Sequence, residues 1–249
     1  MKTCRFKPSG FTLVEMAIVL VIVGLLLGGL LMPLGAQVEQ HKISETQKAL
    51  DEINQALIGF AVANGRLPCP ASATSNGIES PLGGGVCTNP FNGFLPSVTL
   101  GLSQTDSQGY AVDAWGLTQN RIRYAVSTAN TSAFTTLNGM QATTMATLAP
   151  DLRVCASATG ITTTACSAAV SLTNNAVAII YSLGKNAPTG GSGTDEAANP
   201  NPNSANNDQV FVSHTPTPAT AANGEFDDIV TWLSPNILFN RMVTAQKLP

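Results

Sequence analysis

The stretch Lys7-Pro8-Ser9-Gly10-Phe11-Thr12-Leu13-Val14-Glu15-Met16 decides the organisation of this 249-residue chain, because it joins a basic leader to an apolar run. Three basic residues and no acidic residue precede Gly10: Lys2, Arg5 and Lys7. From Phe11 to Gly35 the only charged residue is Glu15. Because an ionisable group inside a membrane span is costly, Glu15 is predicted to be functional and to have a partner.

The apolar run is long enough to cross a bilayer as a helix. Its 25 residues would extend over roughly 37 Å, against a hydrocarbon core of about 30 Å. The basic leader favours a cytoplasmic N-terminus and an extracytoplasmic remainder. A general secretory signal fits less well, because its apolar core is shorter and Leu34 occupies a position where a small residue precedes cleavage. We therefore expect a single-pass inner-membrane protein with a periplasmic head.

The junction resembles the processing site of type IV prepilins and of type II secretion pseudopilins. The matching residues are Gly10, Phe11, Thr12, Leu13 and Glu15. The resemblance implies that a prepilin peptidase cuts after Gly10 and methylates the new N-terminus at Phe11. It also implies that Glu15 pairs with the Phe11 amine of a neighbouring subunit, and that this pair sets the register of a filament. The plain alternative is that Glu15 lies at the membrane interface.

The composition argues against nucleic-acid binding and offers no support for an enzyme. Only 11 % of the residues are charged, and the formal net charge is −3. Loss of the leader leaves nine basic against fifteen acidic residues, so the head has no general attraction for nucleic acid. The sequence has no Gly-x-Ser-x-Gly elbow, no His-Glu-x-x-His, no phosphate-binding loop and no dinucleotide fingerprint. We expect a structural protein rather than an enzyme.

Four cysteines remain once Cys4 is lost with the leader: Cys69, Cys87, Cys155 and Cys166. Four cysteines allow three pairings, and sequence alone does not choose among them. We favour Cys69–Cys87 and Cys155–Cys166, because each pair closes a short loop with little apolar content. A zinc site is the competing interpretation, but there is no Cys-x-x-Cys pair and the two histidines are isolated. Disulfides fit an oxidising compartment.

The chain is predicted to contain three parts: a leader at 1–10, a long helix at 11–64 and a globular head at 65–249. The second half of the helix is amphipathic, since mostly apolar residues recur at three- and four-residue steps. These are Ile43, Thr46, Leu50, Ile53, Leu57 and Phe60. Asn64-Gly65 is a typical helix C-cap, and two prolines follow shortly after it.

The head is predicted to be a pilin-like α+β fold, in which an antiparallel sheet of about four strands packs on the helix. The candidate strands are 94–100, 121–127, 176–183, 210–212 and 229–233. The uniformly apolar run at 176–183 is typical of a central strand. Residues 186–208 are rich in Gly, Asn, Pro and Ser and are predicted to be an exposed loop. A short helix is expected within 234–249.

Two further segments resemble the major pseudopilin of type II secretion. The first is Asp113-Ala114-Trp115-Gly116, and the second comprises Tyr181-Ser182-Leu183-Gly184 together with Asp227-Asp228-Ile229 and Trp232. The resemblance implies a calcium ion bound by Asp227, Asp228 and the carbonyl of Leu183. Asp195, Glu196 and Asp208 are further oxygen donors, since calcium takes six to eight of them. Alternatively, Asp227 and Asp228 solvate the start of the last strand.

These observations lead to two functional hypotheses. The first is a structural subunit of a type IV pilus or of a type II secretion pseudopilus, whose large head is typical of a minor or tip subunit. Its partners would be the prepilin peptidase and other pilin or pseudopilin subunits. The second is a membrane-anchored, adhesin-like binding module that does not polymerise. The exposed loop at 186–208 would then carry the contacts.

Overall fold

The computed structural model describes residues 10–189, 191, 193–199 and 209–248, without the side chains of residues 27–34. The chain divides into two compact units, Met1–Lys42 and Ile43–Pro249. Helix α1 (Leu13–Asn64) contributes residues to both units. Among the described residues, none of the helices combines the length and apolar character needed to cross a membrane.

The second half of α1 is amphipathic, as predicted. Leu50, Ile53 and Leu57 are buried in the main apolar core, whereas the side chains of Lys48 and Asp51 face solvent. The helix ends at the predicted C-cap. Gly65 adopts a φ of +69°, and its amide donates a hydrogen bond of 2.8 Å to the carbonyl of Ala61. A left-handed residue at this position is a common way to end a helix, and glycine adopts it without a steric penalty.

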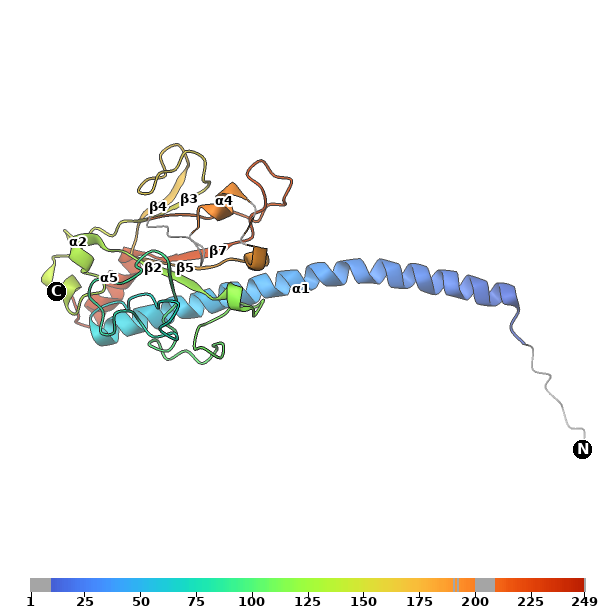
Figure 1. The fold of residues 1–249 in the computed structure, drawn as a ribbon, viewed down its shortest axis with the longest axis horizontal. Coiled ribbons are helices and arrows are strands. Elements are labelled where there is room, and N and C mark those ends of the chain that lie inside the picture. The colour runs from blue at the N-terminus through green and yellow to red at the C-terminus, as the bar shows by residue number, and fades with distance from the viewer. Residues whose placement is uncertain (1–9, 190, 192, 200–208, 249) are drawn as a thin grey trace, which may run out of the picture. The chain divides into compact units, whose positions relative to one another are not determined.

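The predicted four-stranded antiparallel sheet is confirmed (Figure 1). Its strands, in spatial order, are β1 (Gly93–Phe94), β2 (Arg123–Val126), β5 (Ala178–Ser182) and β7 (Ile229–Leu233). Alternate residues of the central strand β5 enter different cores. Ala178 and Ile180 pack in the core that contains α1, whereas Ile179 and Tyr181 pack in a second core on the opposite face. Burial on both faces explains why this strand is a continuous apolar run.

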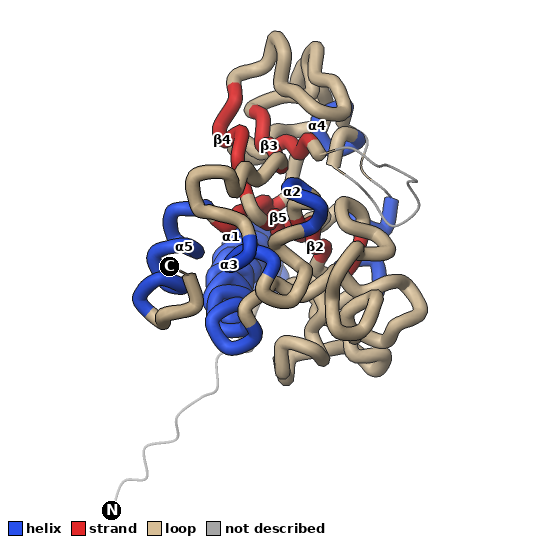
Figure 2. Tube along the Cα trace, turned by 90° about the vertical axis from the view of Figure 1, so that its left-hand side faces the viewer, coloured by secondary structure: helices blue, strands red, loops and turns tan. Residues whose placement is uncertain are grey.

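A second, three-stranded sheet was not predicted. Its strands, in spatial order, are β4 (Ser171–Ala176), β3 (Leu152–Cys155) and β6 (Val210–Val212). Figure 2 shows β3 and β4 on the opposite side of β2 and β5 from α1. The placement of 210–212 in the main sheet was therefore wrong, because β6 pairs in parallel with β3 instead. The ring of Phe211 packs 5.5 Å from that of Tyr181, which joins the two sheets through the second core.

The remaining helices are short. They are η1 (Thr118–Asn120), α2 (Ala129–Ser132), α3 (Gly139–Ala142), η2 (Ala187–Thr189), α4 (Thr194–Ala197) and α5 (Pro235–Thr244). The C-terminal helix α5 confirms the prediction within 234–249. The prediction of an exposed loop at 186–208 holds for Pro188 and Thr189 but is wrong for α4, which contains two buried acidic side chains, Asp195 and Glu196. Hydrogen bonds stabilise these two side chains in their buried positions. Because such contacts do not require apolar residues, the sequence shows no apolar pattern here. Residues 200–208 lie outside the described part.

The first strand is shorter than expected, and the region around it is irregular. β1 ends at Phe94 rather than continuing to residue 100. Pro96 follows at once and accepts a turn hydrogen bond from the amide of Leu100. Since a proline lacks the amide that a ladder requires, the strand stops here.

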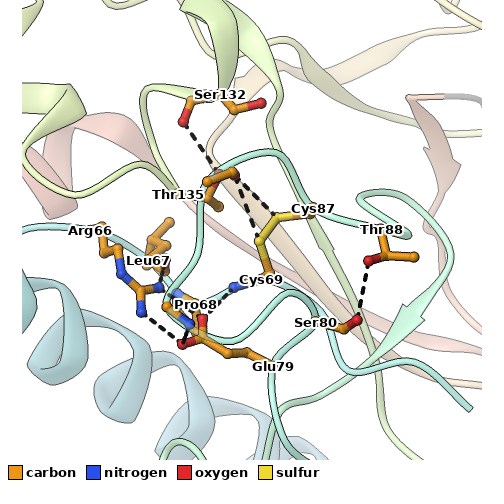
Figure 3. The surroundings of a disulfide bond; sticks show 12 residues. Arg66, Leu67, Pro68, Cys69, Glu79, Ser80, Cys87, Thr88, Ser132 and Thr135 are labelled. Atoms are coloured by element: carbon orange, nitrogen blue, oxygen red, sulfur yellow. Dashed lines mark hydrogen bonds and ion pairs between the residues drawn. A yellow bond between two sulfur atoms is a disulfide. The ribbon is translucent and has the colours of Figure 1, made fainter. Parts of the chain in front are cut away.

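The favoured disulfide pairing is present in the structure. Cys69 bonds Cys87, and Cys155 bonds Cys166. Figure 3 shows the first disulfide beside a buried ion pair between Arg66 and Glu79. The two side chains meet through hydrogen bonds of 2.7 and 2.8 Å.

Candidate functional site

The predicted cleavage point lies on an accessible, non-helical segment. Gly10, Phe11 and Thr12 precede the first residue of α1 and have no regular secondary structure. Phe11 is 80 % exposed. The Gly10–Phe11 bond therefore lies outside the helix and beside an exposed side chain, which is compatible with access by a peptidase.

Glu15 has a local partner that the sequence reasoning missed. Its carboxylate accepts hydrogen bonds from the amide and the hydroxyl of Thr12, at 2.8 and 2.9 Å. The amide of Glu15 donates in return to the Thr12 hydroxyl, at 3.2 Å. This reciprocal pattern is a capping box, which satisfies two of the free amides at a helix start. The spacing Thr-x-x-Glu before an apolar run was the signal.

The first turns of α1 present apolar side chains to their surroundings. Twelve of these side chains are more than two-fifths exposed: Phe11, Leu13, Val14, Met16, Ile18, Val19, Leu20, Val21, Ile22, Val23, Leu25 and Leu26. A continuous exposed apolar surface of this kind marks contact with a membrane or with other proteins. It surrounds the helix on all sides, so it suits lipid or a bundle of like helices.

The head contains a cluster of three acidic side chains: Glu196, Asp227 and Asp228. Glu196 comes from α4, and the two aspartates immediately precede β7. One oxygen from each of the three residues lies within 4.8 Å of the others. Glu196 and Asp228 are buried, and Asp227 is partly exposed. We call Glu196, Asp227 and Asp228 the carboxylate cluster.

Hydrogen bonds fix the members of the carboxylate cluster. Glu196 Oε1 accepts from the amide of Asp227 at 2.9 Å and from the side-chain amide of Asn186 at 2.7 Å. Asp227 Oδ2 accepts from the backbone amide of Asn186 at 3.1 Å, and Asp228 Oδ2 accepts from Asn199 at 2.7 Å. The other oxygen of Asp227, Oδ1, is buried without a hydrogen-bond partner.

The proximity of these carboxylates is electrostatically unfavourable. Burial and the neighbouring charge of Glu196 raise the pKa of Asp227 to about 7. Burial, followed by the charges of Glu196 and Asp227, also raises the pKa of Asp228 well above its usual value. Like charges held close together in a poorly solvated place disfavour ionisation. A bound cation would reverse this effect.

Of the other predicted calcium donors, Asp195 is not part of the carboxylate cluster. Leu183 places its side chain in the core between the two sheets, and the next residue, Gly184, lies against Asp227. A Cβ atom on Gly184 would stand 2.2 Å from Asp227 Oδ1, and the φ of Gly184 is +64°. Asp195 is turned toward His214, whose Nε2 lies 3.1 Å from its Oδ2. Asp208 lies outside the described residues.

The two segments that resemble the major pseudopilin are connected through Asp113. Its carboxylate accepts hydrogen bonds from the hydroxyl of Ser182 and from the side-chain amide of Asn120, and the amide of Trp115 donates to it at 2.9 Å. Asp113 therefore bonds an amide of the turn that follows it. The side chain of Trp115 is only partly buried.

The structure pairs His214 with Asp195, a contact that the sequence did not indicate. The His214–Asp195 pair does not form a catalytic arrangement with Ser157, whose hydroxyl is hydrogen-bonded to Asp195. The Ser157 hydroxyl donates to Asp195 at 3.2 Å rather than to the histidine. The second nitrogen of His214 faces the carbonyl of Thr215 at 2.7 Å. A serine nucleophile would need the imidazole as its base.

Comparison with known proteins supports the interpretation of the N-terminus. Residues 5–31 match the family model of the prokaryotic N-terminal methylation motif, which is consistent with the type IV prepilin and pseudopilin family. The motif implies anchoring by the N-terminal region, processing by a prepilin peptidase and assembly with other pilin subunits. No curated protein and no solved structure matches the chain.

Proposed function

We propose that the protein is a structural subunit of a type IV pilus or of a type II secretion pseudopilus. The observation that carries this proposal is the methylation motif at residues 5–31, with the accessible Gly10–Phe11 bond inside it. Prepilin peptidase cuts after Gly10 and methylates the Phe11 amine. The large head makes the chain a minor or tip-type subunit. Its role is structural, with no catalysis of its own.

Before assembly, the subunit waits in the inner membrane as a single-pass protein with its head in the periplasm. Three basic residues in the leader favour this orientation. The two disulfides of the head also suit an oxidising compartment. On assembly, the exposed apolar side chains of the first turns of α1 exchange lipid for neighbouring helices in the filament core.

Glu15 is the assembly residue in this proposal. In a filament, the methylated amine of one subunit lies near Glu15 of its neighbour. A carboxylate and an amine buried together are far less costly than either charge alone. The pair therefore selects one register among the many that an apolar helix surface would otherwise permit.

The first test is the mass and N-terminal sequence of the full chain produced with and without a prepilin peptidase. We expect a product that begins at Phe11 and is heavier by one methyl group. The variant Gly10→Val should remain uncut, and Gly35→Val, in the same apolar run, should be processed normally. An uncut wild-type chain, or cleavage near Ala36, would contradict the proposal.

Glu15→Ala separates a filament subunit from an anchored, adhesin-like module that does not polymerise. We expect the variant to be processed and to stay in the membrane, but to be absent from sheared filaments. The matched control is Glu39→Ala, which removes a carboxylate beyond the apolar run. Equal recovery of Glu15→Ala and wild type in the filament fraction would favour the anchored module.

We further infer that the carboxylate cluster binds calcium. The donor set fits, because calcium prefers carboxylate and carbonyl oxygens, and Asp227 Oδ1 is a buried acceptor without a partner. Glu196, Asp227 and Asp228 would hold the ion, together with the carbonyl of Leu183. The bound ion would supply positive charge that removes the repulsion among the three carboxylates and stabilises the head.

Calorimetric titration of the full chain in detergent tests the calcium site. We expect binding of calcium, loss of binding in Asp228→Asn, and unchanged binding in Asp51→Asn, which alters an exposed aspartate of α1. Magnesium should bind more weakly, because it dehydrates reluctantly and demands a stricter geometry. Equal binding by wild type and Asp228→Asn would exclude this cluster as the site.

A further inference from the structure

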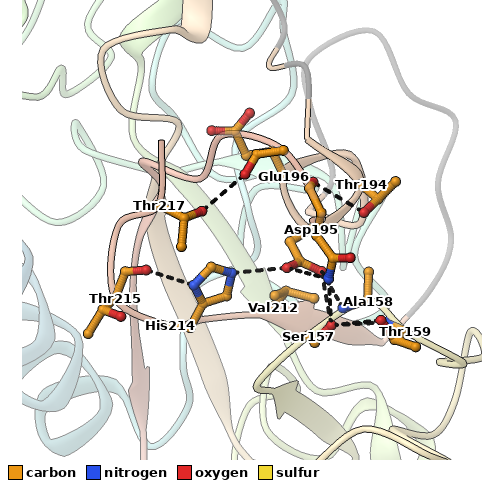
Figure 4. Close-up of polar contacts among 12 residues, drawn as sticks. Ser157, Ala158, Thr159, Thr194, Asp195, Glu196, Val212, His214, Thr215 and Thr217 are labelled. Carbon is orange, nitrogen blue, oxygen red and sulfur yellow. Dashed lines mark hydrogen bonds and ion pairs between the residues drawn. The ribbon is translucent and has the colours of Figure 1, made fainter. Parts of the chain in front are cut away.

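Helix α4 is held by polar contacts to the segments that follow β3 and β6 and to the residues before β7, rather than by apolar packing. It comprises only Thr194, Asp195, Glu196 and Ala197. Nevertheless, Asp195, Glu196 and the following Asn199 are at most 5 % exposed. Figure 4 shows Asp195 with its partners His214, Ser157 and Ala158. Buried polar groups of this kind are retained only where their hydrogen bonds are made.

Asp195 connects α4 to the second sheet. Its Oδ1 accepts a hydrogen bond of 2.6 Å from the amide of Ala158, which follows β3. Its Oδ2 lies 3.1 Å from Nε2 of His214, which follows β6. Since β3 and β6 are the parallel pair of that sheet, Asp195 joins the chain segments that leave the same end of both strands.

Asn199 connects the second sheet to the carboxylate cluster. Its Oδ1 accepts from the amide of Val212 at 2.8 Å, and its Nδ2 donates to the Val212 carbonyl at 3.1 Å. The same Nδ2 donates to Asp228 Oδ2 at 2.7 Å. One side chain therefore holds both backbone groups of the last residue of β6 and one member of the cluster.

Glu196 places a third carboxylate against two others, so that ionisation of the three groups is mutually unfavourable. When α4 is in position, its carboxylate lies in the cluster with Asp227 and Asp228. Without a cation, this repulsion opposes the docking of α4. With a cation, docking completes the ligand set. Binding of the ion and docking of α4 therefore favour each other, and by linkage each strengthens the other equally.

We propose that α4 is a calcium-dependent clasp that fastens the second sheet to the start of β7. The proposal rests on the calcium site proposed above. Calcium holds Glu196 against Asp227 and Asp228, and Asp195 and Asn199, on the same short segment, then hold the ends of β3 and β6. When calcium is withdrawn, α4 loosens and the second sheet loses these contacts, while the first sheet keeps its own.

Hydrogen exchange followed by mass spectrometry tests the clasp on the full chain in detergent, with calcium or with a chelator. We expect calcium to slow exchange in residues 209–214 and 152–158 by about tenfold, and to leave residues 178–182 of β5 unchanged. Asn199→Ala should bind calcium more weakly in the calorimeter, as the linkage requires, and should lose this protection even at calcium concentrations that saturate the variant. Asn174→Ala, an exposed asparagine of β4, is the matched control and should behave like wild type.

The outcomes distinguish failure of the proposed α4 clasp from failure of the proposed calcium site. If wild type binds calcium and residues 209–214 exchange equally with and without it, the clasp is wrong and the site stands. Retained protection in Asn199→Ala also overturns the clasp. If calcium does not bind, both proposals fail. If Asn199→Ala lacks protection from exchange even in β5, the variant is unfolded. Asp195→Asn then replaces it, and exchange in residues 152–158 is measured under the same criteria.

Discussion

Glu79 and Arg66 form an ion pair whose side chains are only 3 % and 8 % exposed. Glu79 also accepts hydrogen bonds from the amides of Cys69 and Gly83, both at 3.1 Å. Glu79→Gln leaves the guanidinium buried without its counter-charge, so we expect a loss of about 3 kcal/mol in the free energy of unfolding. Urea denaturation at neutral pH, with disulfides intact, measures it.

The exposed pair of Lys48 and Glu52 provides the control for this prediction. Its two charged groups are 3.9 Å apart on α1, and both side chains are mostly exposed. Glu52→Gln should therefore cost less than about 0.5 kcal/mol. Similar losses for Glu79→Gln and Glu52→Gln would contradict the structural importance of the buried pair.

The same buried carboxylate predicts how stability depends on pH. Burial alone would raise the pKa of Glu79, but its hydrogen bonds and the charge of Arg66 outweigh burial and hold the pKa below the usual 4.5. Because the folded pKa is depressed, this contribution is fully present above pH 4.5 and is lost as the pH falls through the folded value. The urea midpoint of wild type should therefore fall more steeply than that of Glu79→Gln below pH 4.5. If the urea midpoints of wild type and Glu79→Gln fall with the same slope below pH 4.5, this prediction is wrong.

Gly184 is required both for its backbone angle and for its contact with Asp227. Gly184→Ala should cost about 1–2 kcal/mol for the positive φ, and more because a Cβ would stand 2.2 Å from Asp227 Oδ1. Gly116→Ala is the control, because Gly116 has a φ of +73° and nothing within 4 Å of an added Cβ. We expect only Gly184→Ala to weaken calcium binding in the calorimeter. If Gly184→Ala and Gly116→Ala have equal effects on stability and on calcium binding, the contact between residue 184 and Asp227 is disproved.

At the scale of elements, the second disulfide is part of the second sheet. Cys155 is the last residue of β3, and its bond to Cys166 closes a separation of 11 residues. Replacing both cysteines by alanine should cost about 3 kcal/mol. The resulting increase in hydrogen exchange should be concentrated in residues 152–155 and 171–176.

The first disulfide supplies the comparison. Replacing Cys69 and Cys87 by alanine should cost a similar amount, since the two loops are of comparable length. The exchange should then increase in residues 65–94 and not in the second sheet. Uniform loss of protection in both double variants would show that the head opens as one cooperative unit.

The elements differ in how far their sequences reveal them. Strand β5 is apolar on both faces and was predicted with its central position. Strand β4 was missed, because five of its six residues are at least partly exposed and its sequence, Ser-Leu-Thr-Asn-Asn-Ala, has no burial pattern. Helix α4 was missed because its buried residues are charged. Polar contacts between distant segments fix both elements, and these contacts leave no periodic pattern.

At the scale of the whole molecule, calcium should raise the melting temperature of the head. An ion present at a hundred times its dissociation constant stabilises the folded state by about 2.7 kcal/mol. For a head of this size, that corresponds to a rise of roughly 5–10 °C. Differential scanning calorimetry in calcium and in chelator measures the shift. An equal shift in Asp228→Asn would assign it to another site.

The candidate sites were predicted to different extents. Gly10, Phe11 and Glu15 lie within one short motif, and residues 5–31 match the methylation-motif model, so these candidates could be proposed from the sequence alone. Asp227 and Asp228 were found by resemblance, but Glu196 was only one of several acidic residues considered. It lies 31 residues before Asp227, and the fold selects it by turning it toward the cluster and Asp195 away. The capping role of Thr12 was visible in the spacing and was overlooked.

The strand pairings have a consequence for how the two disulfides form. Almost every pairing joins distant segments, as in Ala125 with Ile179 and Val154 with Phe211. Such non-local topologies fold slowly, so the cysteines are reduced and accessible for some time before the sheets form. Each of the four cysteines bonds its nearest neighbour along the chain, and short loops close at the lowest entropic cost. The native disulfides are therefore favoured kinetically over the other two pairings during folding.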